Sequence, residues 1–469
     1  MPASDTGKYS TQFFLSRLLN QIGELRSQKY PGDSTGPQRW LDLCKGLADT
    51  ALAYLDASEK SGVDPDEKRK LLQDANELGN KVYESLVEMS GSTLNDLPYA
   101  VVIPMQRWFD DLKLPNVTFF RALAEPNYEV ARFLHDDYAG IRDPAQTLTD
   151  ALGKPSDWPI LRVTVPAKAL SVLPQFAIVA HEVGHVVYDQ LGGSKALPPP
   201  PTADIQAYEA ALKAELGGAA PSQDAILFFF QTSQRWIMEL FADAVGLCML
   251  GPAFYFALSS FFESLGPGYV LSRTHPPAVL RRKLAFAKLS RNASCQFLPV
   301  FKKHTNVDLV EDLNSHLLDP AVDSATMMKR LTARGESRDH SAVIVHLPAL
   351  MEKIADSIYA TVETHLQAVK PELIYTSTQY DADLDQHLAS LIAAVPPIET
   401  GKKLKGRAPT ELSCILNVGW AVLLTSLDKL AVRQDETKLP HAERAEKLHA
   451  LLIKAVELSE ARRRWSSTA

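Results

Sequence analysis

The sequence is poor in cysteine and has no long apolar run. Its four cysteines are widely scattered and form no C-x-x-C pair: Cys44, Cys248, Cys295 and Cys414. A disulfide framework or a cysteine zinc cluster is therefore not expected, and a reducing compartment fits best. The apolar stretch 412–424 contains Asn417 and is shorter than the about 20 residues that a membrane span needs.

We expect no secretory signal, and the sequence has no large excess of one charge. Residues 1–10 are polar, and no long apolar segment follows them. There are 49 basic residues against 56 acidic ones, which gives a formal net charge of -7. Nucleic-acid recognition needs a concentrated basic surface, so no nucleic-acid partner is expected. We therefore expect a cytoplasmic protein without a membrane span.

The length of 469 residues indicates more than one folding unit. Apolar residues recur at helical spacing in 10–90 and again after 300. Between these regions, β-branched and aromatic runs typical of strands occur in three segments: 99–104, 116–120 and 158–166. Helical patterns follow, and they predict helices at 174–191, 205–216, 222–250 and 278–289, with a last helix at 442–464.

These patterns predict an α+β protein that is mainly helical. We expect an N-terminal helical region at 1–94, a core with a small sheet at 95–300, and a C-terminal helical region at 301–469. The two flanking regions show no chemical signature of their own. They could shape access to the core or recruit a protein partner.

The first motif that carries chemistry is His181-Glu182-Val183-Gly184-His185, an H-E-x-x-H sequence. Residues four apart share a helix face, so both imidazoles can point at one ion. Neutral imidazole is a good zinc ligand, and Glu182 would place its carboxylate beside the ion, where it can accept a proton from water. The alternative is a buried helix whose histidines bond to backbone carbonyls.

The second motif is Glu239-Leu240-Phe241-Ala242-Asp243, on the next long helix. Two carboxylates in so apolar a helix would be costly to bury without a cation or hydrogen-bond partners. Glu239 would complete a three-ligand zinc site, and Asp243 could accept the second N–H of a ligand histidine. The alternative is an exposed acidic pair on an amphipathic helix.

The third motif is Thr274-His275-Pro276-Pro277, with Arg281 shortly after it. A histidine or arginine beside the zinc could stabilise the oxyanion of a tetrahedral intermediate. The segment could equally be a loop that enters the helix at 278–289.

Together the motifs resemble the gluzincin zinc metallopeptidases, over about residues 158–290. The element from His275 to Arg281 is similar to that of the CAAX prenyl endopeptidases and the bacterial heat-shock membrane peptidases. The resemblance implies a zincin-like core. In it, zinc is bound by His181, His185 and Glu239, with Glu182 as general base and acid. Asp243 would orient a ligand histidine, and His275 would lie near the substrate oxyanion. Those relatives are usually embedded in membranes.

The sequence thus predicts a zinc-dependent peptidase that acts on a peptide or protein, with Zn²⁺ as its cofactor and Glu182, His275 and Arg281 as catalytic residues. Two other functions stay open. One is a helical interaction scaffold with an inactive or autoinhibited protease core. The other is a metallohydrolase that cleaves a non-peptide amide.

Overall fold

The computed structural model describes most of the chain, and its described part is mainly helical. The described residues are 3–30, 35–91, 99–114, 117–123, 129–132, 160–166, 172–197, 202–265, 272–291, 296–309, 324–400, 408–431 and 439–468. Within these ranges, none of the helices combines the length and the apolar character needed to cross a bilayer. The chain divides into two compact units, Met1–Leu170 and Ser171–Ala469. This division lies inside the predicted core at 95–300, and the three-region division stays a prediction.

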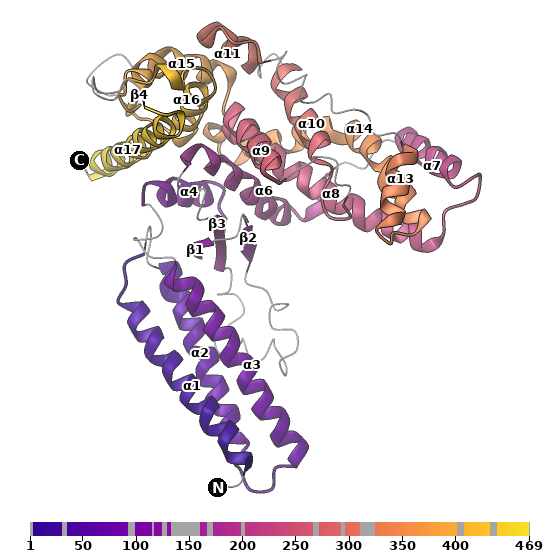
Figure 1. Cartoon of the computed structure of the whole chain (residues 1–469), viewed down its shortest axis with the longest axis vertical. Coiled ribbons are helices and arrows are strands. Elements are labelled where there is room, and N and C mark those ends of the chain that lie inside the picture. The colour runs from indigo at the N-terminus through magenta and orange to yellow at the C-terminus, as the bar shows by residue number, and fades with distance from the viewer. Residues whose placement is uncertain are drawn as a thin grey trace. The chain divides into compact units, whose positions relative to one another are not determined.

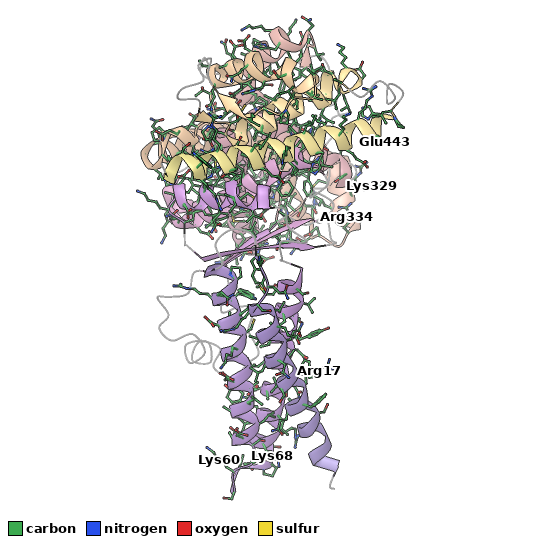
Figure 2. All side chains as sticks on the ribbon, turned by 90° about the vertical axis from the view of Figure 1, so that its left-hand side faces the viewer. Arg17, Lys60, Lys68, Lys329, Arg334 and Glu443 are labelled. Carbon is green, nitrogen blue, oxygen red and sulfur yellow. The ribbon has the colours of Figure 1, made fainter. Side chains whose placement is uncertain are left out.

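The first unit begins with three helices that pack against one another (Figure 1). They are α1 (Ala3–Arg26), α2 (Thr35–Ala57) and α3 (Pro65–Ser90). Apolar side chains at helical spacing fill the space between them, among them Leu15, Trp40, Leu47 and Leu78. Most charged residues lie outside, although Asp74 is buried, and Figure 2 shows Lys60 and Lys68 together at one end of the bundle. Here the helical periodicity of 10–90 correctly predicted the structure.

Helix α4 (Tyr99–Asp111) corrects one expectation. The segment 99–104 was predicted as a strand from its β-branched residues, but it is the first part of this helix. The decisive pattern lies further along the chain, because Val102, Met105 and Phe109 are spaced three and four apart and are all buried. Pro104 lies inside the helix, where it removes one backbone N–H from the helical hydrogen-bond pattern.

Strands lie in the other two segments that the sequence marked. β1 (Val117–Leu123) and β3 (Ile160–Pro166) are parallel, with Val117 opposite Ile160. β2 (Glu129–Arg132) pairs antiparallel with β3 on its other side, so the strand order is β1-β3-β2. β1 also contacts α2, which joins the sheet to the helical bundle of this unit.

The second unit holds the three motifs. Its first half comprises η4 (Leu173–Ile178), α6 (Val179–Gln190), η5 (Gly193–Ala196), α7 (Thr202–Glu215), α8 (Gln223–Leu250), α9 (Pro252–Leu265), α10 (Ala278–Arg291) and α11 (Phe297–Thr305). Its second half comprises α13 (Ser324–Ala333), α14 (Arg338–Val369), η6 (Pro371–Leu373), α15 (Ser377–Ile392), the hairpin strands β4 (Glu399–Thr400) and β5 (Ala408–Pro409), α16 (Leu412–Thr425), η7 (Leu427–Lys429) and α17 (His441–Thr468).

Helix α8 is the central element of this unit. Ser222 caps its first turn, where the hydroxyl accepts the Ala225 N–H, and Gly251 ends it with a positive φ of 54°. At this end Asn417 of α16 bonds both neighbouring helices. Its side chain donates to Leu250 O at 2.8 Å and accepts from Ala253 N at 2.9 Å. The polar residue that interrupts the apolar stretch 412–424 therefore joins α16 to the break between α8 and α9.

The C-terminal helices pack directly on the elements that carry the motifs (Figure 1). Helix α14 lies along α8, where the His340 ring stacks on Phe228 with centroids 4.0 Å apart. Trp420 of α16 donates its indole N–H to Pro174 O at 3.1 Å. His449 of α17 accepts the Leu173 N–H at 2.8 Å. Residues far along the chain thus fix the turn η4, from which α6 starts.

Candidate metal centre

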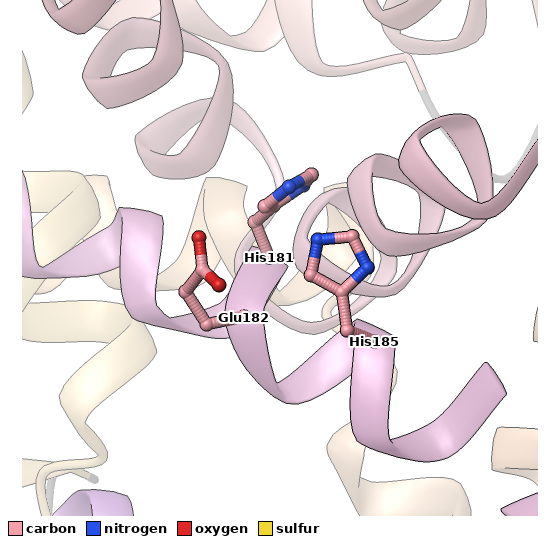
Figure 3. Close-up of side chains that lie close together, drawn as sticks. All are labelled: His181, Glu182 and His185. Atoms are coloured by element: carbon pink, nitrogen blue, oxygen red, sulfur yellow. The ribbon is translucent and has the colours of Figure 1, made fainter. Parts of the chain in front are cut away.

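Helix α6 carries the H-E-x-x-H motif on one of its faces. His181 is buried, and His185 lies one turn further along the same face. The two imidazole rings stand edge to face, with their centroids 4.6 Å apart. Figure 3 shows Glu182 beside them, and ligand atoms of the three residues all lie within 4.8 Å of one another. In the part of the chain that the structure describes, this group of side chains could hold a metal ion.

Helix α8 places both carboxylates of the second motif against these histidines. Glu239 and Asp243 are buried, with 4% and 1% exposure, so they are not an exposed acidic pair. His181 Nδ1 lies 2.8 Å from Asp243 Oδ1, while His181 Nε2 lies 3.3 Å from Glu239 Oε2. His185 Nε2 lies 3.6 Å from the other oxygen of Glu239. The histidines therefore contact side chains, and α6 and α8 bring four predicted site residues together.

The close approach of the two helices depends on Gly184. A Cβ atom at this position would lie 2.6 Å from the Ala242 Cα and 2.9 Å from the Ala242 carbonyl oxygen. Both neighbouring atoms are backbone, so they cannot turn aside as a side chain can. The variable position of the H-E-x-x-H motif thus needs glycine here, because it faces the turn of α8 between Glu239 and Asp243.

We predict that Gly184→Ala separates α6 from α8 and weakens metal binding about tenfold or more, since the positions of metal-binding side chains tolerate only about 0.5 Å of error. Zinc titration of the metal-free protein by calorimetry measures the effect. Gly23→Ala in α1 is the matched control, because a Cβ there meets nothing within 4 Å. Wild-type zinc affinity in Gly184→Ala would show that the helix contact does not set the site.

Arg281 of α10 is the main positive charge at this site. Its Nε and Nη2 atoms each lie 2.7 Å from one oxygen of Asp243, a two-pronged contact. Its Nη1 lies 3.0 Å from Glu239 Oε2, and the whole residue is 5% exposed. The guanidinium also lies over the Phe262 ring, 5.0 Å from its centroid. Arg281 therefore compensates the buried carboxylates and is turned toward them.

These contacts shift the pKa values of the two histidines in opposite directions. Burial and the Arg281 charge act to lower the pKa of His181, but the hydrogen bond and charge of Asp243 outweigh them and raise it to about 9. Burial and the charge on His181 lower the pKa of His185 to about 3. Burial alone would raise the pKa of Glu239, yet Arg281 and His181 hold it well below its usual range. Without a metal, Glu239 is therefore ionised and His185 is neutral, whereas His181 carries a proton that it would have to release to bind a metal.

His275 reaches the same group from the segment before α10. Its Nε2 lies 3.5 Å from Glu239 Oε1, and its Nδ1 lies 2.8 Å from the Thr274 hydroxyl. The His275 side chain is 57% exposed, so one side of it is open to solvent. The third motif was interpreted either as a plain loop or as a part of the site. In the structure it is a loop whose His275 side chain lies beside Glu239.

The donor set is chemically able to hold a metal ion. Two imidazole Nε2 atoms and one carboxylate face one another, and the three-ligand combination of two histidines and a glutamate leaves a fourth position for water. Asp243 accepts a hydrogen bond from His181 Nδ1, so a metal would bind at Nε2 in place of the Nε2 proton. Arg281 is the competing cation, because it lies at hydrogen-bond distance from Glu239.

The structure brings the predicted site residues close together, but the sequence did not indicate how Arg281 is used. Its pairing with Asp243 spans two helices, and no periodicity within either helix signals it. Comparisons with family models, with curated proteins and with solved structures found no match to this chain. The resemblance to gluzincins therefore rests on the sequence motifs alone.

Proposed function

We propose that this protein is a zinc-dependent peptidase of the gluzincin type, with a zincin-like core built around α6 and α8. The observation that supports this most is the convergence of His181, His185 and Glu239 from two helices. Convergence of this kind needs both the spacing within each helix and the close approach at Gly184. Chance matches to a five-residue motif have no reason to meet a buried glutamate on another helix.

Each side chain has a distinct task in this proposal. Zinc, when bound by His181, His185 and Glu239, would supply a Lewis acid that acidifies a water molecule and polarises the scissile carbonyl. Glu182 would take the proton of the attacking water and deliver it to the leaving amine nitrogen. His275 would donate a hydrogen bond to the carbonyl oxygen as negative charge develops there.

Asp243 and Arg281 serve as positioning residues. Asp243 accepts a hydrogen bond from His181 and so fixes its ring, and Arg281 fixes Asp243 through two hydrogen bonds. This role replaces the catalytic role that the sequence suggested for Arg281, because the guanidinium is buried against the two carboxylates.

A second function is favoured by the same ion pair. Arg281 Nη1 lies 3.0 Å from Glu239 Oε2, where it neutralises the carboxylate that a metal would use. If the Arg281 guanidinium stays paired with Glu239 in place of a metal ion, the protease core would be inactive. The helical regions would then serve as a scaffold. Metal analysis separates this possibility from the peptidase.

The decisive test uses the purified full-length chain. We expect about one zinc per chain by plasma mass spectrometry, and cleavage of casein or of a peptide library that a chelator abolishes and added zinc restores. Absence of zinc from protein prepared and titrated with zinc would overturn the proposal in favour of the scaffold. Bound zinc with an uncleaved peptide library would favour a metallohydrolase of non-peptide amides.

A further inference from the structure

The segment 272–277 connects the site to the C-terminal part of the chain. It precedes α10, has no regular secondary structure, and carries His275. Its first residue is held by α8, where the Trp236 indole N–H donates to Ser272 O at 3.0 Å. Its last residues lead into α10, whose Arg281 is buried at the site. His275 itself lies within hydrogen-bond or ion-pair distance of the Thr274 hydroxyl and of Glu239, and its position also depends on how the segment is anchored.

Arg273, the second residue of this segment, provides the anchor. Its Nε donates to Glu336 Oε1 at 2.9 Å and its Nη2 donates to Glu336 Oε2 at 2.6 Å, which is a bidentate pair. Glu336 lies just before α14, in the region that the sequence assigned to a flanking part. The Arg273 guanidinium also lies 5.2 Å from the centroid of the Phe228 ring.

This anchor is built more firmly than an ordinary surface ion pair. The Glu336 side chain is only 17% exposed, although Arg273 is 52% exposed. Hydrogen bonds from Arg273 lower the pKa of Glu336 below its usual range. The Phe228 ring, which lies under the Arg273 guanidinium, is itself stacked on the ring of His340 in α14. His340 Nε2 lies 2.8 Å from Asp224 Oδ2. A planar guanidinium held by two oxygens and an aromatic face has few alternative positions.

We propose that Arg273 and Glu336 form a latch that positions His275 beside Glu239. Both are positioning residues, since neither touches the residues that would bind the metal, and they act through His275. The C-terminal region thereby supplies a residue, Glu336, that the site needs for its geometry. The catalytic part of this proposal rests on the proposed peptidase function, but the structural part does not.

Hydrogen exchange read by mass spectrometry tests the latch without any activity. In Arg273→Gln and in Glu336→Gln we expect the backbone amides of residues 272–275 to exchange about tenfold faster than in the wild type, because the anchored segment opens more often. Lys283→Gln is the matched control. It removes an exposed ion pair of 2.7 Å with Glu352 that also joins α10 to α14 but does not involve the segment. Unchanged exchange in both latch variants, or equal acceleration in Lys283→Gln, overturns the latch.

Kinetics then test whether the latch acts through His275. We expect Arg273→Gln to lower kcat about tenfold with unchanged zinc content and little change in KM. The same substitution made in a His275→Ala background should cause no further loss. The exchanged pair Arg273→Glu with Glu336→Arg should recover part of the rate. Additive losses would overturn the action through His275. If the wild type cleaves no peptide, the proposed function fails, and the exchange measurement still decides the latch.

Discussion

Glu182→Gln is expected to lower the rate of peptide cleavage by about 10²–10⁴-fold, the usual contribution of a general base. Glutamine has the shape of glutamate but cannot take a proton from the attacking water. Glu182 lies on α6 directly after His181, at the side of the group that Figure 3 shows. The proposed ligands are His181, His185 and Glu239, so we expect the variant to keep its zinc. Stopped-time peptide assays and metal analysis on the same sample measure both quantities.

The matched control is Glu209→Gln, which changes an exposed glutamate on α7 in the same unit. It should cleave peptide at the wild-type rate and with the same zinc content. If Glu182→Gln also retains its zinc and cleaves at the wild-type rate, the assignment of the general base is wrong. If it loses its zinc, Glu182 acts as a ligand, which the proximity of its carboxylate to both imidazoles would explain.

Removal of residues 301–469 is expected to destroy metal binding and to give no gain in activity. Helix α14 buries its apolar face along α8, with Val343, Leu347 and Met351 among its buried residues. Each buried side chain of this size contributes about 1.5–3 kcal/mol, so the loss over the whole helix exceeds the about 5–15 kcal/mol that stabilises a typical protein. The truncated chain also loses the Asn417 bonds at the end of α8 and the Trp420 bond to η4.

This result would distinguish an integral C-terminal region from an autoinhibitory one. Circular dichroism, zinc titration and peptide assays of the chain 1–300 should show reduced helix content, no specific zinc site and no cleavage. Trp420→Phe in the full chain is the milder counterpart, because it removes the indole N–H with its hydrogen bond but keeps an aromatic side chain. It should lower the melting temperature by a few degrees, as a loss of about 1 kcal/mol does. A truncated chain that binds zinc and cleaves faster than the wild type would establish autoinhibition.

Local patterns predicted most elements, and they failed where one short window was read alone. The β-branched residues of 99–104 suggested a strand, whereas the spacing of Val102, Met105 and Phe109 continues over a longer window as a helix. For α8 the prediction was accurate to about one residue, because Ser222 and Gly251 mark its ends with side-chain and backbone chemistry of their own. Caps and long periodicities are local, so the sequence displays them directly.

The sequence by itself determined which side chains share a helix face. His181 and His185 are four apart on α6, and so are Glu239 and Asp243 on α8, since helical periodicity requires it. Only the tertiary structure decided what those faces meet. Arg281 joins Asp243 from a third helix, Glu336 holds Arg273 from beyond residue 300, and Asn417 bonds the end of α8. Such contacts depend on how the helices pack against one another. Packing brings together residues that are far apart in the sequence, and no repeating pattern in the sequence indicates which ones will meet.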